Sequence, residues 1–249
     1  MSARLPDRPV RLVLLDIEGT TTPIAFVYDV LFPFARTHLT VWCRGALHTP
    51  EFADVAERMR AEHRADRLSA EAAPEWHDAD ASQTLASVEG YAVWLMDRDR
   101  KSPALKLLQG LIWEQGYQAG TLRGQVYPDV PEAIHRWRAN ACLVAIYSSG
   151  SALAQRRLFE STPSGDLTVS LAGFFDTADG SKLSAASYTR IATSLGVTPG
   201  ETLFVSDVTA ELHAAREAGC QAVLSVRPGN RPQADADRFP VIRSLAEII

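Results

Sequence analysis

The chain has 249 residues, of which 46% are hydrophobic and 22% are charged, a composition typical of a soluble globular protein. A total of 25 Lys and Arg against 30 Asp and Glu gives a formal net charge of −5, and no basic block stands out. This balance argues against a nucleic-acid partner. No apolar run approaches the roughly 20 residues that span a bilayer, so we expect no membrane partner either.

The cysteines and the N-terminal region bear on the cellular compartment. Cys43, Cys142 and Cys220 are far apart in the sequence, and they form neither a CxxC pair nor a Cys/His cluster. This spacing favours neither a disulfide framework nor a structural zinc site. The apolar run Leu12 to Leu15 is too short for a signal peptide, and Asp16 ends it. We therefore expect reduced thiols and a cytoplasmic protein.

Four short apolar runs are predicted to be strands. The first, Val10 to Leu15, lies near the N-terminus, and the others are Cys142 to Tyr147, Thr202 to Val205 and Ala222 to Val226. Runs of this kind are typical of parallel strands that are buried on both faces.

The segment 23–124, after the first strand, is predicted to be an inserted helical cap. It contains amphipathic patterns at residues 30–39 and 104–112 and no convincing buried strand. A polar stretch between them, residues 65–82, is predicted to be a connection or a loose helix. The core is then discontinuous and consists of residues 1–22 and 125–249.

Helices are predicted to alternate with the later strands. One begins at Pro131, and others run from Ser151 to Phe159, from Ala185 to Leu195, and from Thr209 to Ala218, where Gly219 ends the helix. Strands that alternate with helices of this length predict an α/β fold, a Rossmann-like, doubly wound parallel sheet.

Polar residues and one glycine follow three of the predicted strands or precede a helix between them. They are Asp16 and Glu18 after the first strand, Ser148, Ser149 and Gly150 after the second, Lys182 before the helix at Ala185, and Asp207 and Glu211 after the third. Ligands of open parallel sheets bind outside the carboxyl ends of the strands. A carboxylate, a hydroxyl and an ammonium group are the parts needed to move a phosphoryl group through an aspartyl-phosphate.

Each of these groups has a predicted role. Asp16 is the nucleophile, and Mg²⁺ held by Asp16, Asp207 and a nearby backbone oxygen would neutralise the phosphate. Lys182 would stabilise the phosphoryl oxygens and keep Asp16 ionised. Glu18 could protonate the leaving group and later deprotonate the attacking water, and it is the first candidate for the base of an enolisation.

Ser148 is predicted to form an anion cradle together with the backbone N–H groups of Ser149, Gly150 and Ser151 at the start of a helix. Each signal alone has a plainer explanation, because a strand-end Asp is usually a cap, Ser-Ser-Gly is usually a turn, and a lone Lys is usually a solvated charge. Their order along the chain favours a single functional site to which all of these residues contribute.

The same residues resemble the motifs of the haloacid dehalogenase (HAD) superfamily. The run Asp16 to Thr21 is similar to the first motif, with Glu in place of the usual second Asp. Ser148 matches the second motif and Lys182 the third, while the fourth is matched by Asp207 with Glu211.

Over nearly its full length the chain resembles the enolase-phosphatases of methionine salvage, also called acireductone synthases. The segments that carry the resemblance are Leu15 to Val27, Leu105 to Tyr117, Ile146 to Ser151, Phe174 to Tyr188, Leu203 to Leu212 and Val226 to Asn230. Residues 64–86 match nothing in that pattern. The resemblance implies a HAD-like core with an inserted helical cap.

The resemblance also implies a two-step, magnesium-dependent reaction, enolisation and then dephosphorylation of 2,3-diketo-5-methylthiopentyl 1-phosphate. It implies metal ligation by Asp16, Glu18 and Asp207, with Glu18 acting through its backbone carbonyl. Ser148, Ser149 and Lys182 would hold the substrate. Contacts to the diketone are expected near Gln109 and Trp113 in the cap, although core packing explains Trp113 equally well. We expect the protein to act as a monomer.

Three alternatives share some of these features. Another capped phosphatase of the same superfamily, acting on phosphoglycolate or a sugar phosphate, would differ only in its pocket. A receiver-type signalling module also has carboxylates, a hydroxyl and a Lys at strand ends, but its phosphorylated Asp follows a middle strand. A nucleotide-binding protein would carry GxGxxG or a phosphate loop, and neither is present.

Overall fold

The computed structural model describes residues 9–67 and 72–248, and it divides into two compact units. The core unit comprises Met1–Tyr28 and Gly120–Ile249, and the cap unit is Asp29–Ala119. The insertion predicted from the sequence, residues 23–124, is a few residues longer at each end than this cap unit. The side chain of Phe26 is buried. At the other end the backbone N–H of Gly124 donates to the Ser161 carbonyl at 3.1 Å, which ties this segment to the core.

The core unit is built on a six-stranded parallel sheet with the order β3-β2-β1-β4-β5-β6. The strands are β1 (Leu12–Leu15), β2 (Leu143–Tyr147), β3 (Gly173–Phe175), β4 (Thr202–Ser206), β5 (Gln221–Ser225) and β6 (Val241–Ile242). The predicted parallel α/β fold and its four buried strands are confirmed. The sequence did not reveal β3 and β6, which have only three and two residues and are not fully buried.

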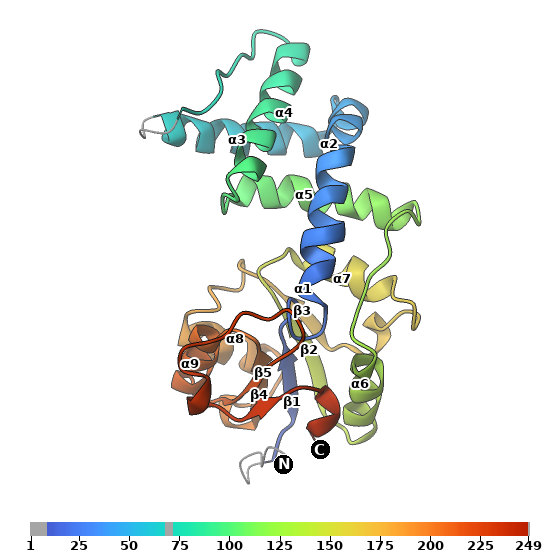
Figure 1. Ribbon diagram of the computed structural model, residues 1–249, viewed down its shortest axis with the longest axis vertical. Coiled ribbons are helices and arrows are strands. Elements are labelled where there is room, and N and C mark those ends of the chain that lie inside the picture. The colour runs from blue at the N-terminus through green and yellow to red at the C-terminus, as the bar shows by residue number, and fades with distance from the viewer. Residues whose placement is uncertain (1–8, 68–71, 249) are drawn as a thin grey trace. The chain divides into compact units, whose positions relative to one another are not determined.

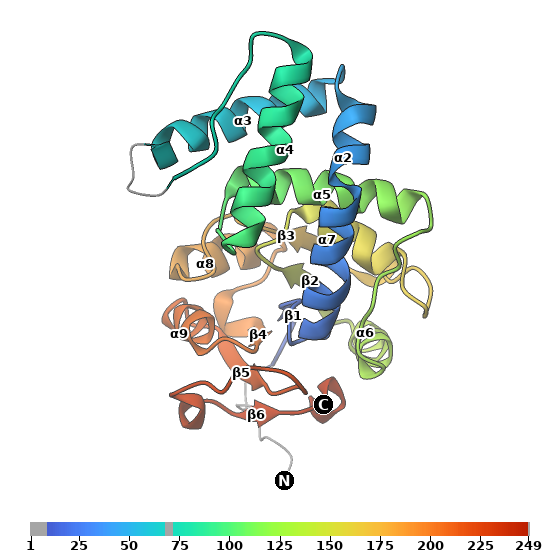
Figure 2. The same ribbon diagram turned by 45° about the horizontal axis from the view of Figure 1, so that its top comes forward.

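Helices cover both faces of this sheet (Figures 1 and 2). On one side lie α8 (Ala185–Ser194) and α9 (Thr209–Glu217), and on the other lie α6 (Asp129–Ala139) and α7 (Ala152–Glu160). Ile191 of α8 and Leu212 of α9 pack in one hydrophobic cluster with Leu12 and Leu14 of β1. The central strand is therefore buried on both faces, as its uninterrupted apolar sequence predicts.

The cap unit is helical throughout its described elements. It contains α2 (Phe32–Ala46), α3 (Pro50–Arg67), α4 (Ala81–Asp97) and α5 (Pro103–Gln118). The helices enclose their own hydrophobic cluster, in which Leu39, Val55, Tyr91 and Leu108 are almost inaccessible to solvent. Each unit thus has a separate core, as expected for an inserted domain.

A short helical segment leads from β1 into the cap. It consists of α1 (Ile24–Phe26) and a π-helix, Val27–Leu31, that runs directly into α2. The indole N–H of Trp113 donates to the carbonyl of Leu31 at 2.7 Å, where the π-helix ends. Trp113 therefore has a structural partner within the cap unit.

The polar connection predicted at 65–82 is shorter in the structure. Helix α3 continues to Arg67, and residues 72–80 contain no helix or strand. Helix α4 begins at Ala81, and the side chain of Asp80 caps it by accepting a hydrogen bond from the Gln83 N–H at 2.8 Å. Residues 68–71 of this stretch lie outside the described residues.

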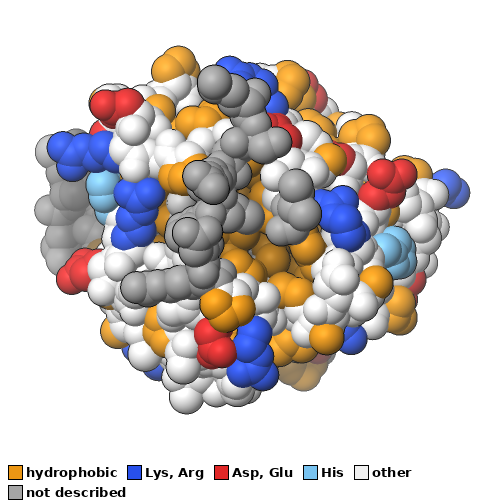
Figure 3. Space-filling view, turned by 90° about the horizontal axis from the view of Figure 1, so that it is seen from below, with side chains coloured by type: hydrophobic (Ala, Val, Ile, Leu, Met, Phe, Trp, Pro, Cys, Tyr) orange, Lys and Arg blue, Asp and Glu red, His pale blue; other side chains and the backbone are white. Residues whose placement is uncertain are grey.

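The cysteines, the helices and the surface charges are the features about which the composition gave expectations. All three cysteines are free and buried. None of the helices in the described ranges is long and apolar enough to cross a membrane. On the face seen in Figure 3, the coloured Lys and Arg side chains are interspersed with Asp and Glu, so no large patch of one sign forms among them.

Candidate active site

The candidate site lies at the carboxyl end of the central strand. Strand β1 pairs with β2 on one side and with β4 on the other, which makes its end a topological switch point of the sheet. Asp16 follows β1, Ser148 follows β2, and Asp207 follows β4. The three strands therefore deliver these side chains to one place, as the sequence pattern predicts.

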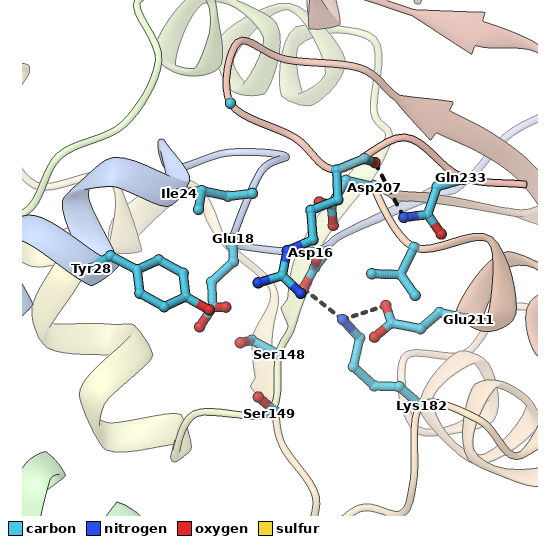
Figure 4. A pocket seen from close by; sticks show the side chains of 13 residues that line it. Asp16, Glu18, Ile24, Tyr28, Ser148, Ser149, Lys182, Asp207, Glu211 and Gln233 are labelled. Atoms are coloured by element: carbon cyan, nitrogen blue, oxygen red, sulfur yellow. Dashed lines mark hydrogen bonds and ion pairs between the residues drawn. The ribbon is translucent and has the colours of Figure 1, made fainter. Parts of the chain in front are cut away.

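These side chains line one pocket of about 470 Å³, which belongs entirely to the core unit (Figure 4). Its lining residues are Asp16, Glu18, Ile24, Tyr28, Ser148, Ser149, Lys182, Asp207, Val208, Glu211, Gly229, Arg231 and Gln233. Seven of the eight predicted site residues are in this set, and Gly150 is not. The pocket holds four carboxylates against two cationic side chains, so it can accept an anionic substrate only with further positive charge.

Lys182 links two of the carboxylates in the pocket. Its Nζ lies 2.6 Å from Asp16 Oδ1 and 2.6 Å from Glu211 Oε2, and its side chain is only 8% exposed. Burial alone would lower the pKa of Lys182, but the two carboxylates outweigh this effect and raise its pKa above the usual value. Lys182 is therefore a permanent cation that holds the Asp16 carboxylate in place.

Buried aromatic side chains position Lys182. The hydroxyl of Tyr188 lies 2.7 Å from the Lys182 carbonyl and 3.1 Å from the Glu211 carbonyl, so it connects the two segments that bear the ion pair. The ammonium group also lies 5.9 Å from the ring centroid of Tyr147 and 5.8 Å from that of Phe204. Contacts with aromatic faces favour the charged form of a buried lysine.

Asp207 is the least compensated carboxyl group of the site. Burial, followed by the nearby charges of Asp16 and Glu211, raises its pKa to about 7, while Lys182 acts in the opposite direction. Burial raises the pKa of Glu211 as well, but Lys182 and the Ser206 hydroxyl, which donates at 2.8 Å, favour its ionised form. Glu211 thus has a cation, Lys182, and a hydroxyl donor as direct partners, which offset part of the effect of its burial.

The turn after β1 carries Asp16 and Glu18 into the pocket. The N–H groups of Thr20, Thr21 and Thr22 all lie within 3.1 Å of the Ile17 carbonyl, so the chain coils tightly here. Gly19 has φ +70°, and a Cβ at this position would lie 2.5 Å from Asp207 Oδ2. Glycine is thus required at this position for two reasons, its backbone conformation and its closeness to Asp207.

The donor atoms at this end of the sheet suit a hard divalent cation. The lining residues supply carboxylate and hydroxyl oxygens and include neither His nor Cys, which excludes a typical zinc site. Within residues 9–67 and 72–248, no group of three or more His, Cys, Asp or Glu side chains converges as a complete metal cage. A cation that keeps several of its own waters fits this arrangement, since it needs few protein ligands.

The predicted anion cradle is smaller than expected. The Gly150 N–H lies 3.4 Å from Ser148 Oγ, and at the start of α7 the Ala152 N–H donates to the carboxylate of Asp176 at 2.8 Å. The helix terminus is therefore already occupied by a carboxylate of the chain itself. Among the predicted cradle groups, Ser148 and Ser149 remain at the pocket.

Some pocket residues were not predicted from the sequence. Tyr28 comes from the π-helix, and Arg231 and Gln233 come from the loop after β5. Gln233 Oε1 lies 3.3 Å from the Thr209 N–H, which fixes this loop against the start of α9. The only signal for this loop was the segment Val226 to Asn230, which was noted for its resemblance and not for a role in the site.

The chain is similar to several known proteins. A family model described as "Hydrolase: haloacid dehalogenase-like hydrolase" matches residues 10–219. "Enolase-phosphatase E1" of Synechococcus elongatus is 48% identical over 89% of this chain and 90% of its own length. A Vitis vinifera protein named "Probable bifunctional methylthioribulose-1-phosphate dehydratase/enolase-phosphatase E1 1" is 44% identical over 96% of this chain, which spans 47% of that longer protein.

Among solved structures, the UTR4 protein of Saccharomyces cerevisiae aligns with a TM-score of 0.72 and 31% identity, over 94% of this chain and 98% of its own. The range matched by the family model, residues 10–219, spans the strand-end residues Asp16, Ser148 and Asp207 of the pocket. The chain belongs to the haloacid dehalogenase-like hydrolases and, within them, to the enolase-phosphatases.

Proposed function

We propose that the protein converts 2,3-diketo-5-methylthiopentyl 1-phosphate into 1,2-dihydroxy-3-keto-5-methylthiopentene and phosphate. The observation that carries this proposal is the buried Asp16 carboxylate, held at 2.6 Å by the Lys182 ammonium group in a pocket that also contains Asp207. Together with membership of the enolase-phosphatases, this geometry supports phosphoryl transfer to Asp16.

Enolisation comes first in the proposed sequence. Glu18 removes a proton from C1 of the substrate and keeps it, the C1=C2 double bond forms, and the C2 carbonyl oxygen takes up a proton from solvent. Ser149, which lines the pocket, would donate a hydrogen bond to that oxygen and stabilise the developing negative charge. A positioned carboxylate base contributes about 10²–10⁴-fold to such a step.

Phosphoryl transfer follows. An Asp16 oxygen attacks phosphorus, and the bond between phosphorus and the C1 oxygen breaks. Because the C1 oxygen is now an enol conjugated with the C3 carbonyl, it is a better leaving group than the alcohol of an ordinary ester, and Glu18 returns the proton to it. Water, deprotonated by Glu18, then attacks phosphorus and releases phosphate from Asp16. Lys182 and Ser148 bind the phosphoryl oxygens throughout.

Family membership implies a metal cofactor, and we propose that it is Mg²⁺. Asp16, Asp207 and the backbone carbonyl of Glu18 would hold the ion. When bound, it supplies the positive charge that lets a carboxylate approach a phosphate. Activity should disappear after exhaustive dialysis against EDTA and return with Mg²⁺, and full turnover of the dialysed protein would contradict this part of the proposal.

The name of the Vitis vinifera relative supports the choice of substrate. It joins a methylthioribulose-1-phosphate dehydratase to an enolase-phosphatase in one chain. Loss of water from methylthioribulose 1-phosphate gives a methylthio-substituted 2,3-diketone phosphate after tautomerisation. An enzyme of this class would therefore produce the compound that the present chain is proposed to consume.

The test compares two readouts in parallel. Ultraviolet absorbance follows the conjugated enol, and a phosphate assay follows hydrolysis, with phosphoglycolate and sugar phosphates as competing substrates. We expect one enol per phosphate and a much higher kcat/KM for the diketone phosphate. If the sugar phosphates are hydrolysed as fast and no enol is formed, the protein is a general capped phosphatase.

We further propose that the protein works as a monomer in the cytoplasm and acts on this small molecule alone. Three free, buried cysteines suit a reducing compartment, and an acidic net charge of −5 suits a free metabolite better than nucleic acid. Light scattering on a size-exclusion column tests the monomer, since a dimer would elute with twice the mass of 27.2 kDa.

A further inference from the structure

Asn230, in the loop after β5, connects two segments that border the pocket. Its Nδ2 lies 2.9 Å from the Gly19 carbonyl and 3.1 Å from the Ser225 carbonyl. Both partners are acceptors only, so the amide nitrogen, which is the donor, must face them. These two contacts therefore fix the orientation of the side-chain amide.

The amide oxygen then faces the metal-binding side of the turn. Asn230 Oδ1 is buried and has no hydrogen-bond partner in the described part of the chain. It lies 2.8 Å from the position that a Cβ on Gly19 would occupy, and Asp207 Oδ2 lies 2.5 Å from the same position. Two acceptor oxygens therefore border one small space with no donor between them, and an unsatisfied buried acceptor is costly.

We propose that Asn230 is a positioning residue of the cation site. Its Oδ1 accepts a hydrogen bond from a water molecule that hydrates the cation beside Asp207, so Asn230 orients the hydration shell without binding the ion directly. This inference rests on the proposed cation site. It also adds to the reason for glycine at position 19, because a side chain there would fill the space between Asp207 and Asn230.

Two substitutions of Asn230 distinguish the role of its amide oxygen from that of its amide nitrogen. Asn230→Asp keeps an acceptor oxygen toward Asp207 and removes the donor that holds the two carbonyls, whereas Asn230→Ala removes both. Ser225→Ala is a matched control, because it removes a hydroxyl that donates to the same Gly19 carbonyl, at 3.3 Å, and leaves both halves of the Asn230 amide in place.

The experiment measures Mn²⁺ binding to the full-length, EDTA-stripped protein without substrate, by electron paramagnetic resonance, and thermal unfolding of the same samples. We expect Asn230→Ala to weaken Mn²⁺ binding by about 10- to 100-fold. The Mn²⁺ affinity of Asn230→Asp should stay within about threefold of the native affinity or exceed it, although this variant also loses thermal stability. Ser225→Ala should leave the Mn²⁺ affinity unchanged.

Equal Mn²⁺ affinities for Asn230→Ala and Asn230→Asp would overturn the inference, because the residue would then act only as a structural tie. Native affinity in Asn230→Ala would overturn it as well. These outcomes leave the proposed function intact, whereas failure of the native protein to bind Mn²⁺ would refute the cation site and the role of Asn230 together.

Discussion

Two polar clusters, one partly buried in the cap unit and one in the pocket of the core unit, contain similar side chains but differ in how their charges are compensated. In the cap, Asp66 accepts hydrogen bonds from the Tyr91 hydroxyl at 2.6 Å and from Arg100 at 2.7 Å. Glu62 accepts from the Ser102 hydroxyl and from the Ala104 N–H at 2.9 Å. Each cap carboxylate thus has donors on both of its oxygens.

The pocket is arranged differently. Lys182 is shared between Asp16 and Glu211, and Asp207 keeps a pKa of about 7 because burial and the neighbouring carboxylates disfavour its charge. A network in which every polar group has a hydrogen-bond partner stabilises one structure. A carboxylate without such compensation can instead be stabilised by a bound cation, so it indicates a functional site. The two clusters therefore differ in how fully each carboxylate is compensated by hydrogen-bond donors or a cation, and not in the number of polar groups that they contain.

The largest expected effect comes from removing the nucleophile. Asp16→Asn keeps the shape of the side chain but cannot form the phosphoryl-enzyme, so phosphate release should fall by at least about 10⁴-fold. Circular dichroism should show a folded protein. Asp237→Asn, at an exposed position, is the matched control. A folded Asp16→Asn variant with near-native rates would remove the basis for calling this cluster catalytic.

Loss of the shared cation should have the next largest effect. Lys182→Met removes the positive charge at the phosphoryl oxygens and should lower kcat by about 10²–10³-fold. Lys106→Met, on the exposed side of α5, should match the native protein. If both variants have the same kcat on the diketone phosphate, the ion pair between Lys182 and Asp16 is structural, like those of the cap.

The pH dependence of metal binding tests the uncompensated charge directly. Burial raises the pKa of Asp207 to about 7, so in the metal-free protein the protonated form is favoured below this pH. A divalent cation binds the ionised form, and its affinity should therefore be highest above pH 7 and fall by up to about tenfold per pH unit below it.

Calorimetry of Mg²⁺ binding in buffers with different ionisation enthalpies measures this linkage. Close to one proton should be released per ion at pH 6 and almost none at pH 8. The same affinity and no proton release at both values would show that Asp207 is already compensated within the protein.

The smallest effect on activity is expected in the cap network. Asp66→Asn weakens the contacts with Arg100 and Tyr91 and should lower the free energy of unfolding by about 1–3 kcal/mol. Hydrolysis of para-nitrophenyl phosphate should stay within about twofold of native, because the phosphoryl-transfer groups belong to the core unit. Asp54→Asn, which disrupts an exposed ion pair with Arg58, should change neither quantity. A large loss of activity in Asp66→Asn would link the two clusters.

The sequence predicted the parts of this structure that depend on regular patterns. The four long strands are uninterrupted apolar runs, and the residues that follow β1, β2 and β4 reach one pocket because parallel strands end at the same edge of a sheet. Strand β3 is three residues long and half-buried, so its composition gave no comparable signal.

The remaining parts of the site depend on loops, whose course in space has no sequence period. Lys182 was predicted as a site residue, and it reaches Asp16 across 166 residues of sequence. By contrast, nothing predicted that Asp176 would occupy the start of α7, beside the expected phosphate-binding cradle. Arg231 follows a turn, and nothing in the pattern indicated that it lines the pocket. The raised pKa of Asp207 follows from burial beside Asp16, which only the folded arrangement produces.

The most direct test of the account is to trap the phosphoryl group on the protein. The enzyme is mixed with the diketone phosphate, quenched in acid and reduced with borohydride, which converts an aspartyl phosphate to homoserine that peptide mass spectrometry can locate. We predict homoserine at position 16 when substrate is present, and none when substrate is omitted or when Asp16 is replaced by Asn. An unmodified Asp16 during active turnover of the native protein would contradict covalent phosphoryl transfer at this site.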